Sequence, residues 1–261
     1  MAVFDLAACV ALLDDLTAIA ARAAAAIRQS RREPLRRKAD GSPVTAADEA
    51  AEAVIGEGLK GLAPGVPIIS EEQAAAGKAG PPSKRSASYF LVDPLDGTRE
   101  FIAGRDEFTV NIALVIAGAP LLGVIAAPAF ELTWRGIVGR GADRIARGGK
   151  TAIHSRPRPQ KPVVMASRSH LDPNTGAYIE ALPQKVTEIC GSSIKFCRIA
   201  EGTADLYPRL GPTHDWDVAA GHAIVRAAGG AVTAPDGSPL VYGTRDLLIP
   251  HFVATGDPRM T

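Results

Sequence analysis

Two carboxylates stand three residues apart where an apolar run ends, in the segment Asp93-Pro-Leu-Asp96-Gly-Thr98. The run before them, residues 89–92, is typical of a buried strand, and Gly97 then frees the backbone. Removing a carboxylate from water is costly unless it is paired or binds a metal. Oxygen ligands of this kind suit Mg²⁺, which takes one or two carboxylates together with substrate phosphate oxygens. The segment therefore predicts a magnesium site for phosphate chemistry, with Thr98 placing a hydroxyl beside the acids.

Other acids also follow apolar strands or open helices, where ligand sites form in folds built on sheets. Each acid alone is more often a helix cap or a solvated turn, but their recurrence favours one shared site. The sequence has no His-x-x-x-His and no cysteine-rich zinc spacing, so we expect a hard, oxygen-bound cation: Mg²⁺, with Mn²⁺ as a substitute. The candidate carboxylates are Asp40, Asp48, Glu71, Glu72, Asp93, Asp96, Asp215 and Asp217.

The elements that must position these acids follow from hydrophobic periodicity. Helices are predicted over 3–30, 46–60, 174–182, 193–202 and 215–228. Strands are predicted over 66–70, 89–93, 108–117, 121–127, 132–138, 162–166, 185–190, 204–207, 231–234 and 251–255. Residues 74–88 have the Ala, Gly, Pro and Ser composition of a mobile loop. The Arg-Pro-Arg-Pro stretch at 156–159 divides the chain into an N-terminal half, 1–155, and a C-terminal half, 156–261.

The composition is that of an ordinary globular protein, with 46% hydrophobic and 22% charged residues. A formal net charge of +1 gives no electrostatic reason to expect nucleic acid or an anionic membrane as a partner. The N-terminus lacks the basic region of a signal peptide. Residues 108–130 carry no charge, but Gly118-Ala-Pro120 divides them into a buried hairpin rather than a membrane span. Three cysteines without a Cys-x-x-Cys pair favour a reducing, cytoplasmic setting.

Four motifs in this order resemble those of the inositol monophosphatase superfamily of Mg²⁺-dependent, Li⁺-sensitive phosphatases. They are Asp40-Gly-Ser-Pro-Val-Thr45-Ala-Ala-Asp48, Ser70-Glu-Glu72, Asp93 to Phe101 and Trp216 to Gly221. The resemblance covers nearly the whole chain and implies an α+β fold, a layered αβαβα sandwich. It implies two or three Mg²⁺ ions whose ligands are Glu71, Asp93, the carbonyl of Leu95, Asp96 and Asp217. It also implies that Thr98, with Asp48 or Asp40 behind it, orients the attacking water, and that Glu72 lies just behind the ligands.

Within the superfamily, residues 101–114 and 191–209 resemble the 3′(2′),5′-bisphosphate nucleotidases of the bacterial CysQ type. A bisphosphate needs one phosphate at the metals and positive groups for the other. The residues expected to bind substrate are Gly97, Thr98, Ser167, His170, Ser192, Lys195 and Arg209. The implied reaction is hydrolysis of the 3′-phosphate of adenosine 3′,5′-bisphosphate to AMP and phosphate, in sulfur assimilation. The related 3′-phosphoadenosine 5′-phosphosulfate is a second expected substrate.

Two other functions are left open at this point. A phosphatase for inositol monophosphate or fructose 1,6-bisphosphate would share the fold, although Lys195 and Arg209 argue against it. An RNA- or transcription-associated regulator with this fold is disfavoured by the intact acid set and the near-neutral charge. We expect a small-molecule nucleotide as partner, no nucleic acid, no transmembrane segment, and a monomer or homodimer. We expect a cytoplasmic location, with a peripheral one at the inner membrane as the alternative. His214 and Asp215, just before the last motif, depart from the family pattern.

Overall fold

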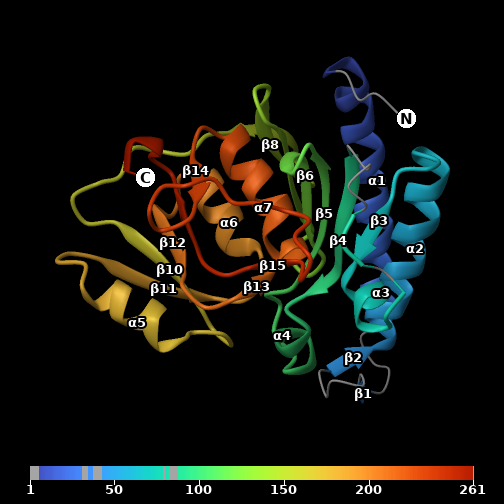
Figure 1. Cartoon of the computed structure of the whole chain (residues 1–261), viewed down its shortest axis with the longest axis horizontal. Helices are drawn as coiled ribbons and strands as arrows, with labels where there is room; N and C mark the ends of the chain where they lie inside the picture. Colours follow the sequence, from blue (N-terminus) through green and yellow to red (C-terminus); the bar gives the residue numbers. More distant parts are fainter. Residues whose placement is uncertain (1–5, 31–34, 38–42, 79, 83–87, 261) are drawn as a thin grey trace.

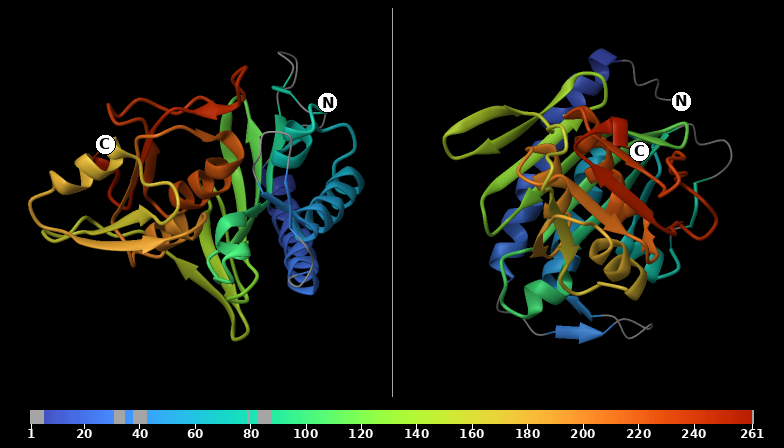
Figure 2. Two further views of the ribbon diagram at one scale, coloured as in Figure 1. Left: turned by 90° about the horizontal axis from the view of Figure 1, so that it is seen from below. Right: turned by 90° about the vertical axis from the view of Figure 1, so that its left-hand side faces the viewer.

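The computed structural model describes residues 6–30, 35–37, 43–78, 80–82 and 88–260. Its elements form five layers in the order helix, sheet, helix, sheet, helix, which can be followed from right to left in Figure 1 and in the left-hand view of Figure 2. This arrangement confirms the predicted layered αβαβα sandwich. Asp40 and the first residues of the predicted helix over 3–30 lie outside the described residues, as do parts of the predicted loop at 74–88.

The first helical layer consists of α1 (Leu6–Gln29) and α2 (Ala46–Leu62). Apolar side chains that recur at helical spacing on α1, such as Leu16 and Ile27, pack with Ile55 and Leu59 of α2 against one face of a large sheet. Full burial of a side chain of this size contributes about 1.5–3 kcal/mol relative to leaving it in water. The two helices therefore hold the outer face of the sheet that carries the first acids.

The large sheet has seven strands in the order β3-β4-β5-β6-β7-β8-β9. Their bounds are β3 Ile68–Ser70, β4 Ser88–Asp96, β5 Thr109–Ile116, β6 Ala119–Ala127, β7 Leu132–Ile137, β8 Gly141–Ala146 and β9 Gly149–Ile153. β3 runs parallel to β4, and the other neighbours are antiparallel. Phe90 and Val92 of β4 face α1 and α2, while Tyr89 and Leu91 face the opposite core. Burial on both faces explains the continuous apolar run that leads to Asp93.

The middle helical layer consists of α6 (Ile194–Ala200) and α7 (Asp215–Ala227). α7 lies so close to β6 that a side chain at Gly123 would collide with the carbonyl of Ala220. Residues of the predicted halves, 1–155 and 156–261, share one hydrophobic cluster, in which Leu91 packs with Ile224. The start of α7 is thereby fixed against the large sheet. The division into two halves stays a prediction.

A second sheet of five strands has the order β11-β10-β12-β16-β14. Their bounds are β10 Val163–Ser167, β11 Val186–Cys190, β12 Leu206–Arg209, β14 Ala231–Thr233 and β16 Phe252–Thr255. The outer layer is α5 (Pro173–Glu180), whose Ile179 packs on Val164 and Leu206. The remaining elements are β1 Leu35–Arg37, β2 Pro43–Thr45, α3 Glu71–Ala75, α4 Thr98–Ile102, β13 Thr213–His214, β15 Leu248–Ile249 and a 3₁₀ turn at Pro258–Met260.

The predicted helices and long strands are present with ends close to those expected, but β8 and β9 are not among the predictions. Their sequences, Gly-Ala-Asp-Arg-Ile-Ala and Gly-Lys-Thr-Ala-Ile, lack the apolar alternation that marks a strand, because most of their side chains are partly or fully exposed. α3 takes up the first two residues of the predicted loop at 74–88. Among the described helices, none is both long and apolar enough to cross a membrane.

Candidate active site

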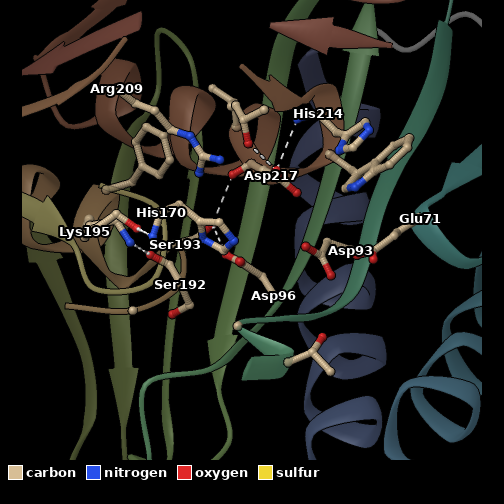
Figure 3. Close-up of a pocket in the computed structure, with 18 of the residues that line it drawn as sticks. Glu71, Asp93, Asp96, His170, Ser192, Ser193, Lys195, Arg209, His214 and Asp217 are labelled. Carbon is tan, nitrogen blue, oxygen red and sulfur yellow. Dashed lines mark hydrogen bonds between the residues drawn. The ribbon is translucent and has the colours of Figure 1, made fainter. Parts of the chain in front are cut away.

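A pocket of about 400 Å³ opens between the end of β4, α4, the loop before α6 and the start of α7. Figure 3 shows Asp93, Asp96 and Asp217 near its centre, with Lys195 and Arg209 on one side. Acids and cations from distant parts of the chain are thus brought together in one cavity. The predicted residues that line it are Glu71, Asp93, Leu95, Asp96, Gly97, Thr98, Ser167, His170, Ser192, Lys195, Arg209 and Asp217.

Asp93 is only 2% exposed, and the pairing of β4 with β5 becomes irregular between Asp93 and Asp96. One of its oxygens, Oδ1, accepts a hydrogen bond from the backbone N–H of Leu95 at 3.0 Å. Burial raises the pKa of Asp93 well above its usual value. The neighbouring carboxylates that raise it further are Glu71, Asp96, Asp217 and Asp48. A buried acid beside four others is unfavourable unless protons or cations neutralise the group.

The carboxylate of Asp96 is held by side chains from both halves of the chain. Ser193 Oγ donates to Asp96 Oδ2 at 2.6 Å, and Asn111 Nδ2 donates to the same oxygen at 3.3 Å. Burial and the charge of Asp217 raise the pKa of Asp96, while the ammonium of Lys195 acts in the opposite direction. Sequence reasoning did not single out Ser193 or Asn111, although both lie inside the stretches on which the substrate prediction depends.

Asp217 lies in the first turn of α7 and closes that turn onto the preceding chain. Its Oδ2 accepts a hydrogen bond from the backbone N–H of His214 at 3.1 Å and another from the hydroxyl of Thr213. An acid three residues after the cap position is the usual partner in such a contact. The segment before the helix therefore sets the orientation of Asp217. Thr213 is a third residue that sequence reasoning missed.

Glu71 is the first residue of α3, and the turn that carries it is anchored on α2. Ser70 caps α3 and donates its hydroxyl to Glu52 Oε1 at 2.6 Å, and Gln73 Nε2 donates to the same atom at 2.8 Å. Glu52 therefore fixes the position of Glu71. No local signal in the sequence distinguishes Glu52 from the other polar residues of α2. Glu72 is half-buried beside Glu71, and its role behind the ligands stays a prediction.

Thr98 begins α4, and its Oγ1 lies 3.0 Å from the Leu95 carbonyl oxygen and 3.3 Å from Asp48 Oδ1. Asp48 is 2% exposed. Its other oxygen, Oδ2, accepts hydrogen bonds from the N–H and hydroxyl of Thr45 at 2.7 and 2.6 Å. The Thr98 hydroxyl thus faces a carboxylate that is rigidly oriented by the cap of α2. Asp40, the other candidate behind Thr98, lies outside the described residues.

Gly97 joins the acids to Thr98 in a backbone conformation that other residues rarely adopt. Its φ is +90°, and a Cβ at this position would lie 2.9 Å from the backbone oxygen of Glu107. Glycine is required here for both reasons. A larger residue would push Thr98 away from the acids.

On the side of the pocket that carries the cations, the ammonium of Lys195 already forms hydrogen bonds with backbone carbonyls. Lys195 is 3% exposed, and its ammonium donates to the carbonyl oxygens of Ser192 at 2.6 Å and Cys190 at 3.2 Å. It also lies 5.1 Å above the ring centre of Tyr207. These contacts fix the loop that carries Ser192.

Arg209 and His170 are more open to the pocket. Arg209 is half-buried, and its Nη2 donates to the carbonyl of Pro212 at 3.3 Å. His170 is exposed at the pocket mouth, and its backbone N–H donates to Ser167 Oγ at 3.3 Å. The pKa of His170 is lowered, first by partial desolvation and then by the charges of Arg209 and Arg99. Arg99 also lines the pocket and was not among the predicted residues.

His214 and Asp215 have separate environments although they are adjacent. The His214 ring stacks on Trp216 with ring centres 4.5 Å apart and an angle of 6° between the planes. Asp215 is fully buried and accepts a hydrogen bond from the N–H of Gly243 at 2.7 Å. Burial raises its pKa to about 6. Asp215 is thus buried at the start of α7, whereas His214 and Trp216 line the pocket.

The donor set fits a hard cation. Every predicted ligand offers oxygen, and the raised pKa values of Asp93 and Asp96 show that their negative charges need neutralising partners. Within the described ranges, no three acidic, histidine or cysteine side chains are yet close enough together to enclose an ion. The fit therefore rests on the chemistry and electrostatics of the donors.

Comparison with known proteins places these observations in a family. The model of the inositol monophosphatase family matches residues 11–258. A protein of Escherichia coli (strain K12) named 3′(2′),5′-bisphosphate nucleotidase CysQ is 47% identical over 216 residues, 82% of this chain and 86% of that protein. The protein of that name from Haemophilus influenzae is 34% identical over 226 residues, 84% of this chain and 82% of that protein.

Solved structures show the same likeness. The crystal structure of CysQ from Bacteroides thetaiotaomicron, described as a bacterial member of the inositol monophosphatase family, has a TM-score of 0.78 and 35% identity. The match covers 93% of this chain and 96% of that one. An inositol monophosphatase from Anabaena (Nostoc) has a TM-score of 0.76 and 27% identity, and the match covers 97% of this chain and 93% of that one.

Proposed function

The chain belongs to the inositol monophosphatase family, and we propose on that basis that it is a magnesium-dependent 3′(2′),5′-bisphosphate nucleotidase. It hydrolyses the 3′-phosphate of adenosine 3′,5′-bisphosphate to AMP and phosphate, in sulfur assimilation. The related 3′-phosphoadenosine 5′-phosphosulfate is a second substrate. The observation that carries this proposal is that clustered carboxylates face Arg209 and His170 in one pocket. Such a cavity can place one phosphate among metal ligands and the other among cations.

The proposed metal ligands are the oxygen donors at the centre of the pocket. They are Glu71, Asp93, the carbonyl of Leu95, Asp96 and Asp217. When bound, Mg²⁺ neutralises charge on the phosphoryl oxygens and lowers the pKa of water. We propose two or three such ions, with Mn²⁺ able to replace them. Glu72 supports this set from behind.

Thr98 and Asp48 orient the attacking water in the proposed reaction. The Thr98 hydroxyl lies between Asp48 Oδ1 and the Leu95 carbonyl, so it can accept a hydrogen bond from a water while donating its own proton. The water oxygen bonds to phosphorus and releases a proton, the bond to the ribose 3′-oxygen breaks, and that oxygen takes up a proton from solvent as it leaves. Positioning and electrostatics supply most of the rate acceleration in phosphoryl transfer.

Other features support a reducing location. Cys9, Cys190 and Cys197 are the three cysteines of the chain, and all are free. Free thiols are typical of a reducing compartment. We therefore place the reaction in the cytoplasm, with a peripheral position at the inner membrane as the alternative. The working form is a monomer or homodimer with a small-molecule nucleotide as its partner.

A phosphate-release assay on a substrate panel tests the proposal. The panel contains adenosine 3′,5′-bisphosphate, 3′-phosphoadenosine 5′-phosphosulfate, inositol 1-phosphate and fructose 1,6-bisphosphate, each with and without Mg²⁺. We expect the highest kcat/KM for the first two compounds and no turnover without metal. A preference for inositol phosphate would contradict the nucleotide assignment, and co-purification with nucleic acid without any phosphatase activity would favour a regulator.

A further inference from the structure

Because Lys195 is buried, other side chains are needed to bind the phosphate that is not hydrolysed. An ammonium has three N–H donors, and Lys195 directs two of them to the carbonyls of Cys190 and Ser192. Its third N–H is the only one that a phosphate could take without breaking a contact that holds the 190–193 loop. Most of the N–H donors that meet a substrate phosphate in the cavity must therefore come from other side chains.

Arg99 is exposed and lines the same pocket as Thr98, its neighbour in α4. Its Nη1 lies 3.4 Å from the carbonyl oxygen of Ser169, near the limit for a hydrogen bond. The next residue, Glu100, is 2% exposed and accepts a hydrogen bond from the hydroxyl of Ser169. Two successive residues of α4 therefore hold the Ser169–His170 segment, and the Arg99 side chain extends toward His170.

Arg209 approaches the same segment from β12. Figure 3 shows its guanidinium pointing into the cavity toward the side where His170 lies. The charges of Arg209 and Arg99 both lower the pKa of His170, after the larger effect of desolvation. Within the described part of the chain, neither arginine forms an ion pair with a carboxylate. Two arginines that form no ion pair among the described residues thus act on one histidine at the pocket wall.

We propose that Arg99 and Arg209, whose charges both act on His170, bind the phosphate that is not hydrolysed, and that Lys195 positions the 190–193 loop. The proposal rests on the proposed nucleotidase function and adds Arg99 as a residue that determines substrate specificity. A phosphate dianion between two guanidinium groups balances both charges and accepts planar, paired N–H donors from each. His170 donates a further N–H to the same anion.

The position of Arg99 links the two ends of the substrate. Thr98 is proposed to orient the attacking water, and Arg99, the next residue of α4, is proposed to bind the phosphate at the other end of the substrate. A bisphosphate that binds Arg99 therefore contacts the same short helix that positions Thr98. A monophosphate lacks this anchor, which gives the enzyme a physical basis for discrimination between the two classes.

The test compares two substrates that are cleaved at the same bond. Wild type, Arg99→Ala, Arg99→Lys and the control Arg140→Ala, at an exposed arginine in the β7–β8 turn, are assayed with adenosine 3′,5′-bisphosphate and with 3′-AMP. For Arg99→Ala we expect KM for the bisphosphate to rise about 10- to 100-fold more than KM for 3′-AMP, as for loss of a charge-assisted contact. Arg99→Lys should recover part of this effect, because it keeps the charge but loses the paired donors.

Binding of AMP, which carries only the second phosphate, is measured by calorimetry as a readout independent of turnover. We expect Arg99→Ala to weaken AMP binding by a similar factor and Arg140→Ala to leave it unchanged. A wild-type enzyme without preference for the bisphosphate would contradict the proposed function. A wild-type preference that survives in Arg99→Ala, together with unchanged AMP affinity, would overturn the role of Arg99 while leaving the function intact.

Discussion

The hydroxyl of Ser193 donates to Oδ2 of Asp96 at 2.6 Å, across a sequence separation of 97 residues. The same hydroxyl oxygen accepts a hydrogen bond from Asn111 at 2.9 Å and lies 3.1 Å from the backbone oxygen of Asp217. Ser193 therefore joins two proposed metal ligands that come from different halves of the chain. The acids reach their common position only when both halves have folded against each other.

Replacing Ser193 by alanine should weaken metal binding without removing any ligand. Loss of a hydrogen bond behind a ligand typically lowers metal affinity or activity by about 10- to 100-fold. We expect Ser193→Ala to raise the Mg²⁺ concentration for half-maximal activity by about 10-fold. Ser238→Ala, at an exposed turn residue, serves as the control. An unchanged Mg²⁺ requirement in Ser193→Ala would show that Asp96 does not depend on this contact.

Asp96→Asn should separate stability from activity. Asp96 lies among like charges, and burial and Asp217 raise its pKa. Removing its charge should therefore raise the melting temperature of the metal-free protein while abolishing nearly all turnover. Melting curves and phosphate release measured with and without Mg²⁺ provide the check. Activity close to that of wild type would contradict the assignment of Asp96 as a ligand.

Stabilisation by Mg²⁺ should increase with pH. The raised pKa of Asp93 means that the folded protein retains protons at pH values where the unfolded chain has released them. The stability of the metal-free protein then falls as pH rises through this elevated pKa. Mg²⁺ replaces those protons, so its binding releases protons and strengthens as pH rises. The Mg²⁺-induced rise in melting temperature should be larger at pH 8 than at pH 5.5, and an equal rise would count against a protonated cluster.

Lys195→Ala should affect both substrate binding and the fold of its loop. The substitution leaves the carbonyls of Ser192 and Cys190 without their donor, which costs about 1–3 kcal/mol if they stay buried. We expect a lower melting temperature and, because the loop that Lys195 positions carries Ser192, a larger increase of KM for adenosine 3′,5′-bisphosphate than for inositol 1-phosphate. Comparison of the two KM values decides the matter, because equal increases would mean that Lys195 supports the site generally and does not select the nucleotide.

The predictable part of the site is the part with a local signature. An apolar strand that ends in an acid can be recognised from a few neighbouring residues, as at Asp93. The hydrogen bonds of Lys195 cannot be recognised in this way, because its partners depend on how the 190–193 loop turns back on α6. Arg99 looks like a solvated helix residue until the Ser169–His170 segment is placed beside it. Long-range contacts that orient side chains therefore cannot be predicted from the sequence alone.

The hairpin of β8 and β9 illustrates the same limit in the fold. β9 is the edge strand of the large sheet and β8 lies next to it, and most side chains of both strands are partly or fully exposed, so few need to be apolar. Their pairing depends on β7, which already presents a free edge. In contrast, β4 and β5 are buried on both faces, and their apolar runs predict them directly.

Stability between pH 7.5 and 5.5 should depend on His222. This residue of α7 is 5% exposed, and its Nδ1 lies 2.9 Å from the hydroxyl of Tyr242. Burial lowers its pKa to about 3, and the charge of Arg226 acts in the same direction. The unfolded chain, with a histidine pKa of about 6.5, binds more protons below that pH. The stabilising contribution of His222 is therefore complete above pH 6.5 and is lost as pH falls toward 3.

Between pH 7.5 and 5.5 this loss amounts to about 1 kcal/mol. In metal-free protein, we subtract the unfolding free energy at pH 5.5 from that at pH 7.5. This signed difference should be lower by that amount in His222→Gln than in wild type. Urea unfolding at each pH measures it, and titration of the acidic cluster cancels in the comparison because both proteins share it. The control is His251→Gln, at an exposed position, which should keep the wild-type pH dependence. A pH dependence in His222→Gln equal to that of wild type would mean that His222 accepts a proton without unfolding, contrary to its burial against Tyr242.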